Sequence, residues 1–394
     1  MKKITLSLAA IALIATAAQA DIKSKSFGGN ASLFYGTNDA GNGDLLNKGT
    51  SYGDSAVHLG GAASVGACDT CVTLNYGVTG VSTMGLENTL VAGTWVDHRG
   101  LVKDAVWIDT LNLSFMPLSG VSNTTMVLGR QALDTPMVFS EKWNIAQNTY
   151  DAAVAVNNDI VDTTLVAAWV GRSNITGAVN AAGGTTVVAD NFGDGFTSFL
   201  TKSGAFAFGA VTKAITGVTA QGWYYIAPSF AKVAWLQADT EYMGFGLGAQ
   251  YVYTDPNAGS TGNGYAVKLG YNYEGIGLSA AYSSNDDKLV TAANLGGAQS
   301  KLYTEAWWNY GKVSAPDTDS YNVTATYSAK DIADFGIYYT NADHNGGSTG
   351  DLEEIAVTAG KDLGNLNLTL AYINGKVDGG SSQNDVQVYA NYKF

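Results

Sequence analysis

Residues 264–274, GYAVKLGYNYE, decide the class of fold. Apolar or aromatic side chains stand at every second position from Tyr265 to Tyr273, whereas the positions between them include Lys268 and Asn272. A helix would repeat its apolar positions about every 3.6 residues, so a period of two indicates a β-strand with one apolar and one polar face.

The same period of two recurs along the chain after residue 20, and we count eighteen segments that carry it. They lie at about residues 27–37, 54–67, 71–83, 105–116, 124–131, 148–157, 163–172, 204–215, 219–227, 229–240, 242–253, 264–274, 276–285, 319–329, 334–342, 353–362, 366–375 and 384–394. Short turns alternate with long connectors such as 173–203 and 286–319, which we expect to be external loops. The sequence therefore predicts an all-β fold, an antiparallel transmembrane β-barrel of about eighteen strands with both termini in the periplasm.

The N-terminus has the features of a secretory signal peptide. Lys2 and Lys3 precede an apolar run at residues 4–17, and Ala18-Gln19-Ala20 is a small-x-small cleavage signature. The apolar run is too short to span a membrane comfortably as an anchor helix. We therefore expect residues 1–20 to be removed and residues 21–394 to form one domain, the outer-membrane barrel.

The composition fits a barrel whose strands face lipid on one side and water on the other. Charged residues make up 14% of the chain, below the ~25% of ordinary soluble domains, while Gly is abundant at 48 residues. The net charge of −13 becomes −15 without the signal peptide, which contributes two lysines and no acid. This balance excludes nucleic acid as a partner and favours attraction of cations.

The two cysteines form the pattern Cys68-Asp-Thr-Cys71. A zinc site would need a second ligand pair, which His58, His98 and His344 are not spaced to provide. A redox motif would need a βαβ unit, which the strand pattern lacks. We therefore interpret Cys68 and Cys71 as a small structural disulfide in an oxidising compartment.

No motif predicts catalysis or a cofactor. The glycine-rich residues 244–249 resemble a phosphate-binding loop, but they lie inside an alternating strand instead of opening a helix. No predicted strand brings a Ser, a His and an acid together as a hydrolytic triad requires. The sequence thus predicts a protein that is not an enzyme and binds no cofactor.

Several blocks of sequence are similar to one group of porins. They are GRQALDTP at residues 129–136, FSEKWN at 139–144, VNND at 156–159, TLVAAW at 164–169 and VYANYKF at 388–394. With these residues the chain resembles the OprD-like porins and the major outer-membrane porins of the Campylobacter group. The resemblance implies eighteen strands, a homotrimer in the Campylobacter-type branch, and a third external loop folded into the lumen as a constriction, here residues 132–147. The chain departs from the OprD branch because it has no ladder of arginines.

Taken together, these features predict a passive porin for small hydrophilic solutes and ions in outer-membrane lipid, with a weak preference for cations. We expect the pore constriction to contain Asp134, Glu141, Lys142 and Asp151. We expect the lumen wall to contain Arg130, Arg172, Lys268 and Glu274. The alternative is a surface adhesin or structural barrel acting through its loops, but a barrel of roughly 16–18 strands leaves a channel whereas one of 8–10 does not.

The first testable prediction concerns processing. Mass measurement of the protein from outer membranes should give a chain that begins at Asp21 with Cys68 and Cys71 joined. The disulfide closes a very short loop, so its reduction should change stability little. Two thiols that alkylate freely without reductant would contradict the disulfide.

Overall fold

The computed structural model describes residues 22–65, 72–92, 104–143, 145–174, 176–179, 185–188, 195–200, 202–228, 230–346 and 350–394. The expected signal peptide and the pair Cys68 and Cys71 lie outside these described residues.

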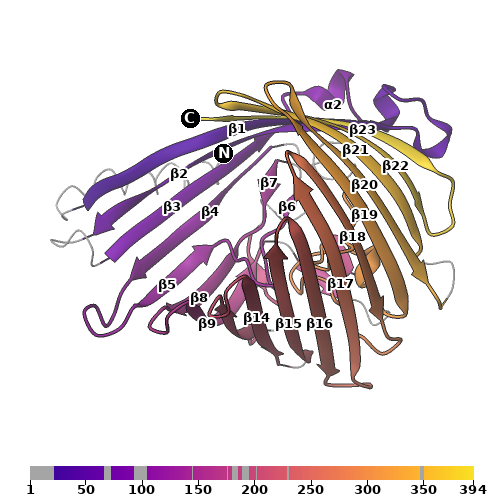
Figure 1. Ribbon diagram of the computed structural model, residues 1–394. Coiled ribbons are helices and arrows are strands. Elements are labelled where there is room, and N and C mark those ends of the chain that lie inside the picture. The colour runs from indigo at the N-terminus through magenta and orange to yellow at the C-terminus, as the bar shows by residue number, and fades with distance from the viewer. Residues whose placement is uncertain are drawn as a thin grey trace.

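Eighteen strands form a closed antiparallel β-barrel (Figure 1). They are β1 (Ile22–Asn38), β2 (Ser51–Val65), β3 (Val72–Ser82), β4 (Asp104–Phe115), β5 (Thr124–Gln131), β8 (Tyr150–Asn157), β9 (Thr163–Ser173), β13 (Ala205–Thr212), β14 (Val218–Ala227), β15 (Ala231–Tyr242), β16 (Phe245–Pro256), β17 (Gly262–Tyr273), β18 (Ile276–Asn285), β19 (Thr318–Ala329), β20 (Ala333–His344), β21 (Leu352–Leu363), β22 (Leu366–Val377) and β23 (Gln383–Lys393). Each overlaps one predicted strand, so the predicted fold class is confirmed.

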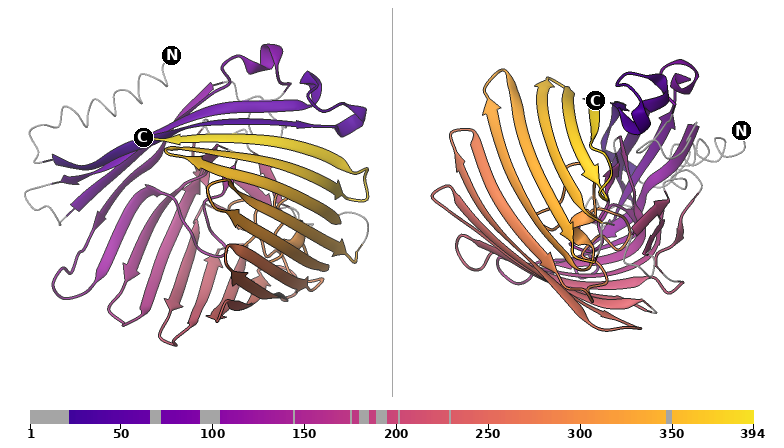
Figure 2. Two further views of the ribbon diagram at one scale, coloured as in Figure 1. Left: turned by 45° about the horizontal axis from the view of Figure 1, so that its top comes forward. Right: turned by 90° about the vertical axis from the view of Figure 1, so that its right-hand side faces the viewer.

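Closure is made by the first and last strands. β1 and β23 lie side by side (Figure 2) and pair from Asn30 opposite Lys393 to Asn38 opposite Asp385. The start of β1 and the end of β23 therefore lie at one end of the barrel, which we call the terminus end, and we call the opposite end the loop end. Among the described residues, every strand of the ring pairs with a neighbour on both sides over part of its length, as a barrel surrounded by hydrocarbon requires.

The remaining elements are short. They are the hairpin β6 (Lys142–Trp143) and β7 (Ala146–Gln147), the hairpin β10 (Thr176–Val179) and β11 (Thr185–Val188), β12 (Thr197–Ser198), the helix α2 (Leu86–Thr89), and the 3-10 turns η1 (Ala40–Asn42), η2 (Lys48–Thr50) and η5 (Lys312–Ser314). None of the helices in the described part of the chain is long and apolar enough to cross a membrane.

The outer face of the barrel is apolar and the inner face is mixed. On β17, Leu269 is 54% exposed on the outer face, whereas its neighbours on the inner face include the fully buried Ala266. Asn272 lines a cavity of about 600 Å³ on the inner wall. The register of this strand therefore agrees with the period of two in its sequence.

The inner face is buried because two segments enter the barrel from the loop end. One joins β5 to β8, and Figure 1 shows its hairpin β6–β7 within the ring of strands. The other joins β18 to β19 and spans residues 286–317. We expected this second segment to be an external loop, but its residues Leu289, Leu295 and Leu302 are buried in the barrel core, so that expectation is corrected.

The second testable prediction concerns this register. Leu269→Arg should cost about 2–4 kcal/mol, the penalty for an arginine facing the middle of the hydrocarbon. Asn272→Arg, on the inner face of the same strand, should be tolerated. Urea titration of both variants refolded into vesicles measures the difference, and the reverse order of stability would mean that the two faces are exchanged.

Candidate functional site

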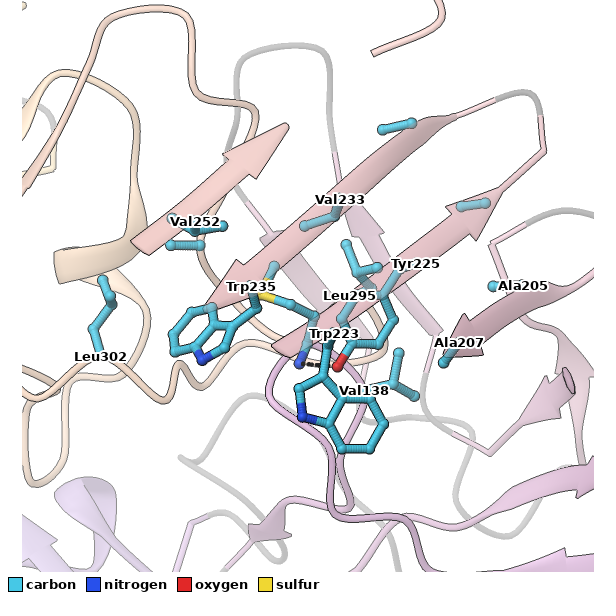
Figure 3. Packing of buried hydrophobic residues seen from close by; sticks show 14 of the residues in the cluster. Val138, Ala205, Ala207, Trp223, Tyr225, Val233, Trp235, Val252, Leu295 and Leu302 are labelled. Atoms are coloured by element: carbon cyan, nitrogen blue, oxygen red, sulfur yellow. Dashed lines mark hydrogen bonds between the residues drawn. The ribbon is translucent and has the colours of Figure 1, made fainter. Parts of the chain in front are cut away.

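The first inward segment, residues 132–149, is held against the inner wall by apolar packing. Met137 and Val138 are almost completely buried, and Val138 lies beside Trp223 and Tyr225 of β14 (Figure 3). The Met137 N–H donates to the Tyr225 hydroxyl at 3.2 Å. An isolated antiparallel β-bridge between Asp134 and Phe139 closes a turn that contains Met137 and Val138. The segment thus crosses from β5 toward the wall at β14.

The second inward segment, residues 286–317, is bonded to the first. The Leu295 N–H donates to the Met137 carbonyl at 2.8 Å, and the Asn294 side-chain amide donates to the Phe139 carbonyl at 2.8 Å. At the surface of both segments Lys301 pairs with Asp134, and its ammonium lies over the Phe139 ring at 4.8 Å. The two segments therefore form a single packed partition in the lumen.

Glu141 is at the centre of this contact. Its side chain is 1% exposed, and its Oε1 accepts from Asn294 Nδ2 at 2.9 Å and from the Gln299 N–H at 2.7 Å. Its own N–H donates to Asn148 Oδ1 at 2.6 Å. Glu141 therefore binds the two segments to each other and does not project into open lumen.

Glu354 of β21 fixes the second segment to the barrel wall. This buried carboxylate accepts from the N–H groups of Trp307, Trp308 and Asn309 at 2.8, 3.1 and 2.8 Å, and from Asn309 Nδ2 at 2.7 Å. Hydrogen bonds to an ionised acceptor are stronger than neutral ones. One side chain thus satisfies three consecutive backbone groups that would otherwise be enclosed without partners.

Glu305 stabilises the segment from within. Its carboxylate accepts the N–H groups of Ser300, Ala306 and Gly311 at 2.6, 3.0 and 3.0 Å. Loss of solvation raises the pKa of Glu305 to about 7, although the three N–H donors act in the opposite direction.

Lys268 of β17 is on the inner face of its strand and lines the cavity of about 600 Å³. Its ammonium lies 3.7 Å from Asp239 Oδ1 and 4.2 Å from the centre of the Tyr303 ring. The Tyr303 hydroxyl donates to the same Asp239 oxygen at 2.7 Å. The group joins the second segment to the wall at β15 and β17, so the charge of Lys268 is largely balanced.

Lys142 lies between two cavities of the lumen. A cavity of about 720 Å³ extends along β1, β2 and β23, and one of about 340 Å³ is lined by Trp307, Trp308 and Tyr389. Lys142 and Ile145 of the β6–β7 hairpin line both. The hairpin therefore separates the two cavities and places an exposed ammonium at their boundary.

His58 lies in the larger cavity. Its Nδ1 is 2.8 Å from Asp109 Oδ2, which also accepts from the Thr79 hydroxyl at 2.5 Å. The arrangement is an ion pair of the lumen wall. In the described residues no group of three or more metal-ligating side chains is positioned to hold a metal ion.

The structure places Arg130, Asp151 and Arg172 on the outer face and not in the lumen. Arg130 is paired across the strands with Asp151, and Asp151 with Arg172. The next residues on the same face, Leu128 and Trp169, are exposed on the outside of the barrel. Our expectation that these three charges line the pore is therefore corrected by the strand register.

Glu274 is also not on the wall. It forms the two-residue turn between β17 and β18 together with Gly275, and both have positive φ, 45° and 83°. This turn geometry matches the twist of a hairpin and puts the Glu274 side chain at the rim of the terminus end.

The sequence analysis did not identify the second inward segment or its anchors. A signal was present, because residues 286–317 contain Leu289, Leu295, Leu302, Trp307 and Trp308. A loop in water has no reason to carry so many large apolar side chains. The role of Glu354 had no such signal, because a glutamate among strand residues does not indicate which loop it contacts.

The site and fold together define a class: a closed eighteen-stranded barrel with a packed partition in its lumen. Solved structures share this fold across most of the chain. The outer membrane protein OpdK of Pseudomonas aeruginosa is similar with a TM-score of 0.73 and 10% identity, over 94% of this chain and 99% of that one. OccK9 (OpdG) of the same species has a TM-score of 0.71 and 12% identity over 95% and 98% of the two chains. OccAB4 of Acinetobacter baumannii has a TM-score of 0.68 and 11% identity over 94% and 98%.

At these identities the likeness shows a common fold. It confirms the eighteen-stranded barrel that the resemblance implied, while the assignment to the OprD-like or the Campylobacter-type porins stays a prediction. No protein-family model and no curated protein sequence matches the chain.

The third testable prediction concerns the anchor of the second segment. Glu354→Gln keeps the shape but weakens the four hydrogen bonds to residues 307–309, so we expect a loss of about 1–3 kcal/mol. Freed segments should also increase the open-channel noise of single barrels in planar bilayers. Glu353→Gln, the adjacent residue on the outer face, is the matched control. Equal noise in both variants would mean that Glu354 does not hold the segment.

Proposed function

We propose that the protein is a passive, water-filled porin of the outer membrane for small hydrophilic solutes and ions. The observation that carries the proposal is the lumen itself. A closed barrel of this strand number leaves room for a channel. The partition fills only part of that room, because cavities of about 720, 600 and 340 Å³ remain along the inner wall.

The outer face supports the location. Exposed Leu, Val, Phe and Tyr side chains surround the barrel, as a band in contact with hydrocarbon requires. The similarity in fold to the outer membrane protein OpdK agrees with this location. In this membrane the loop end would face the exterior and the terminus end the periplasm. The homotrimer stays a prediction that follows from the resemblance alone.

Charges inside the lumen favour weak cation selectivity. The carboxylates of Glu141 and Glu354 lie inside the partition, where they accept hydrogen bonds from its backbone and amide N–H groups. Their field acts in a partly enclosed space where screening by salt is incomplete. Lys142 is an exposed cation of the partition and lines two of the cavities, so it should partly offset their effect.

The fourth testable prediction is a measurement of selectivity. In planar bilayers under a KCl gradient, the reversal potential of the wild-type channel should indicate a preference for K⁺ over Cl⁻. Lys142→Gln should increase that preference, because it removes an exposed ammonium between the two cavities. Lys232→Gln, on the outer face at 52% side-chain exposure, is the matched control and should change nothing.

Two results would contradict the proposal. A barrel that folds but conducts no ions would favour the surface adhesin or structural role. A channel that prefers Cl⁻, or one unaffected by Lys142→Gln, would mean that other charges control the pore.

A further inference from the structure

The charged cluster on the outer face has an organised geometry. The Asp151 carboxylate accepts two hydrogen bonds from Arg130, from Nε to Oδ1 at 2.8 Å and from Nη2 to Oδ2 at 3.3 Å. Arg172 Nη2 lies 2.7 Å from the same Oδ2. Two guanidinium groups therefore share one carboxylate, and the cluster keeps one net positive charge.

Arg130 is fully engaged within the protein. Its Nη1 donates to the Ile108 carbonyl at 2.9 Å, where β4 continues beyond the end of its partner β5. The ring of Phe196 covers the guanidinium at 3.2 Å from its centre. Asp151 and Arg130 are 18% and 21% exposed, so together they form a fixed base for the cluster.

Arg172 is the open member of the cluster. Its side chain is 57% exposed, and within the described part of the chain its guanidinium pairs with Asp151 alone. A guanidinium has five N–H donors in a planar fork that matches the oxygens of a phosphate. The exposed donors of Arg172 point to an anionic ligand outside the barrel.

The cluster lies at the boundary of the apolar band. On β9 the outward-facing residues below Arg172 are Trp169, Ala167 and Leu165. On β19 the corresponding outward row begins with Asp319 and continues through Tyr321 and Val323. Arg172 therefore stands beside the loop end of its strand, beyond the apolar outward residues, as Asp319 does on β19.

The sign of the charge distinguishes the cluster from the rest of this boundary. Elsewhere on the described strands, the outward charges at the loop end are Asp104, Lys232, Asp255, Asp319, Asp343, Glu353 and Lys376. Five of these seven are acids, and Lys232 is 3.8 Å from Asp255. Lys232 and Lys376 each lie opposite one acid, Asp255 and Glu353, whereas Arg130 and Arg172 share the single carboxylate of Asp151 and so form the site of net positive charge.

We propose that Arg172, supported by Arg130 and Asp151, binds a phosphate group of the glycolipid in the outer leaflet. The inference rests on the outer-membrane location in the proposed function, but not on transport. The lipid phosphate supplies the negative charge that the cluster attracts, with Trp169 beside its acyl chains. A headgroup phosphate at this level needs no penetration of charge into the hydrocarbon.

The experiment titrates the full detergent-solubilised protein with bisphosphorylated lipid A and counts bound lipid by native mass spectrometry. Arg172→Gln should weaken retention about tenfold, the loss expected for one charge-assisted contact. Lys232→Gln, which removes a cation at the same level, should bind as the wild type does. Dephosphorylated lipid A should bind wild type and Arg172→Gln equally. Resistance of the barrel to detergent unfolding at room temperature confirms that each variant is folded.

Three outcomes would overturn the proposal. Equal lipid A retention in Arg172→Gln and wild type would remove the site. Complete competition by millimolar inorganic phosphate would mean that the cluster binds free phosphate and not lipid. A change in the number of chains per particle in Arg172→Gln, with lipid retention unchanged, would make the cluster a contact between copies. Channel conductance, recorded separately, tests the porin function independently.

Discussion

The structure depends on one constraint, that every backbone N–H and C=O surrounded by hydrocarbon must find a partner within the protein. The pairing of β1 with β23 meets it by removing both edges of the sheet. Closure then forces one face of every strand outward and the other inward, which is why a period of two runs through the sequence. It also creates an interior that is too wide for wall side chains alone to fill.

The interior is occupied by chain with only short stretches of ladder pairing, so much of its backbone needs other acceptors. Three carboxylates supply them. Glu354 reaches the second inward segment from the wall, Glu305 folds it from within, and Glu141 joins it to the first segment. A carboxylate can accept several N–H groups at once, which suits irregular backbone better than a neutral amide does. In the proposed porin function, the same side chains that position the partition would also contribute to the field that an ion meets.

The strands could be predicted because the cause of their pattern is local: one residue faces lipid and the next faces water. The inward position of residues 286–317 could not be read from that pattern, since its cause is contact between segments far apart in the chain. Asn294 donates a hydrogen bond to the Phe139 carbonyl, and the Trp307 N–H donates one to Glu354. No sequence pattern indicates that these residues are partners. Only the excess of buried leucine and tryptophan indicated that this connector avoids water. Residues 132–147 were assigned by resemblance, which carries information about such contacts that periodicity does not.

In the charged cluster, the period of two predicts the face of Arg130 but not that of Arg172. Arg130 follows Met126 and Leu128 at even spacing, so the alternation itself puts it on the lipid-facing side. Arg172 differs, because it is three residues from Trp169 and strict alternation would turn it inward. The register shift opposite Asp151 and Ala152 inserts one extra residue on β9 and returns Arg172 to the outer face. A single bulge thus converts a lumen position into a lipid-facing one, and the two arginines share one carboxylate only because that bulge is present.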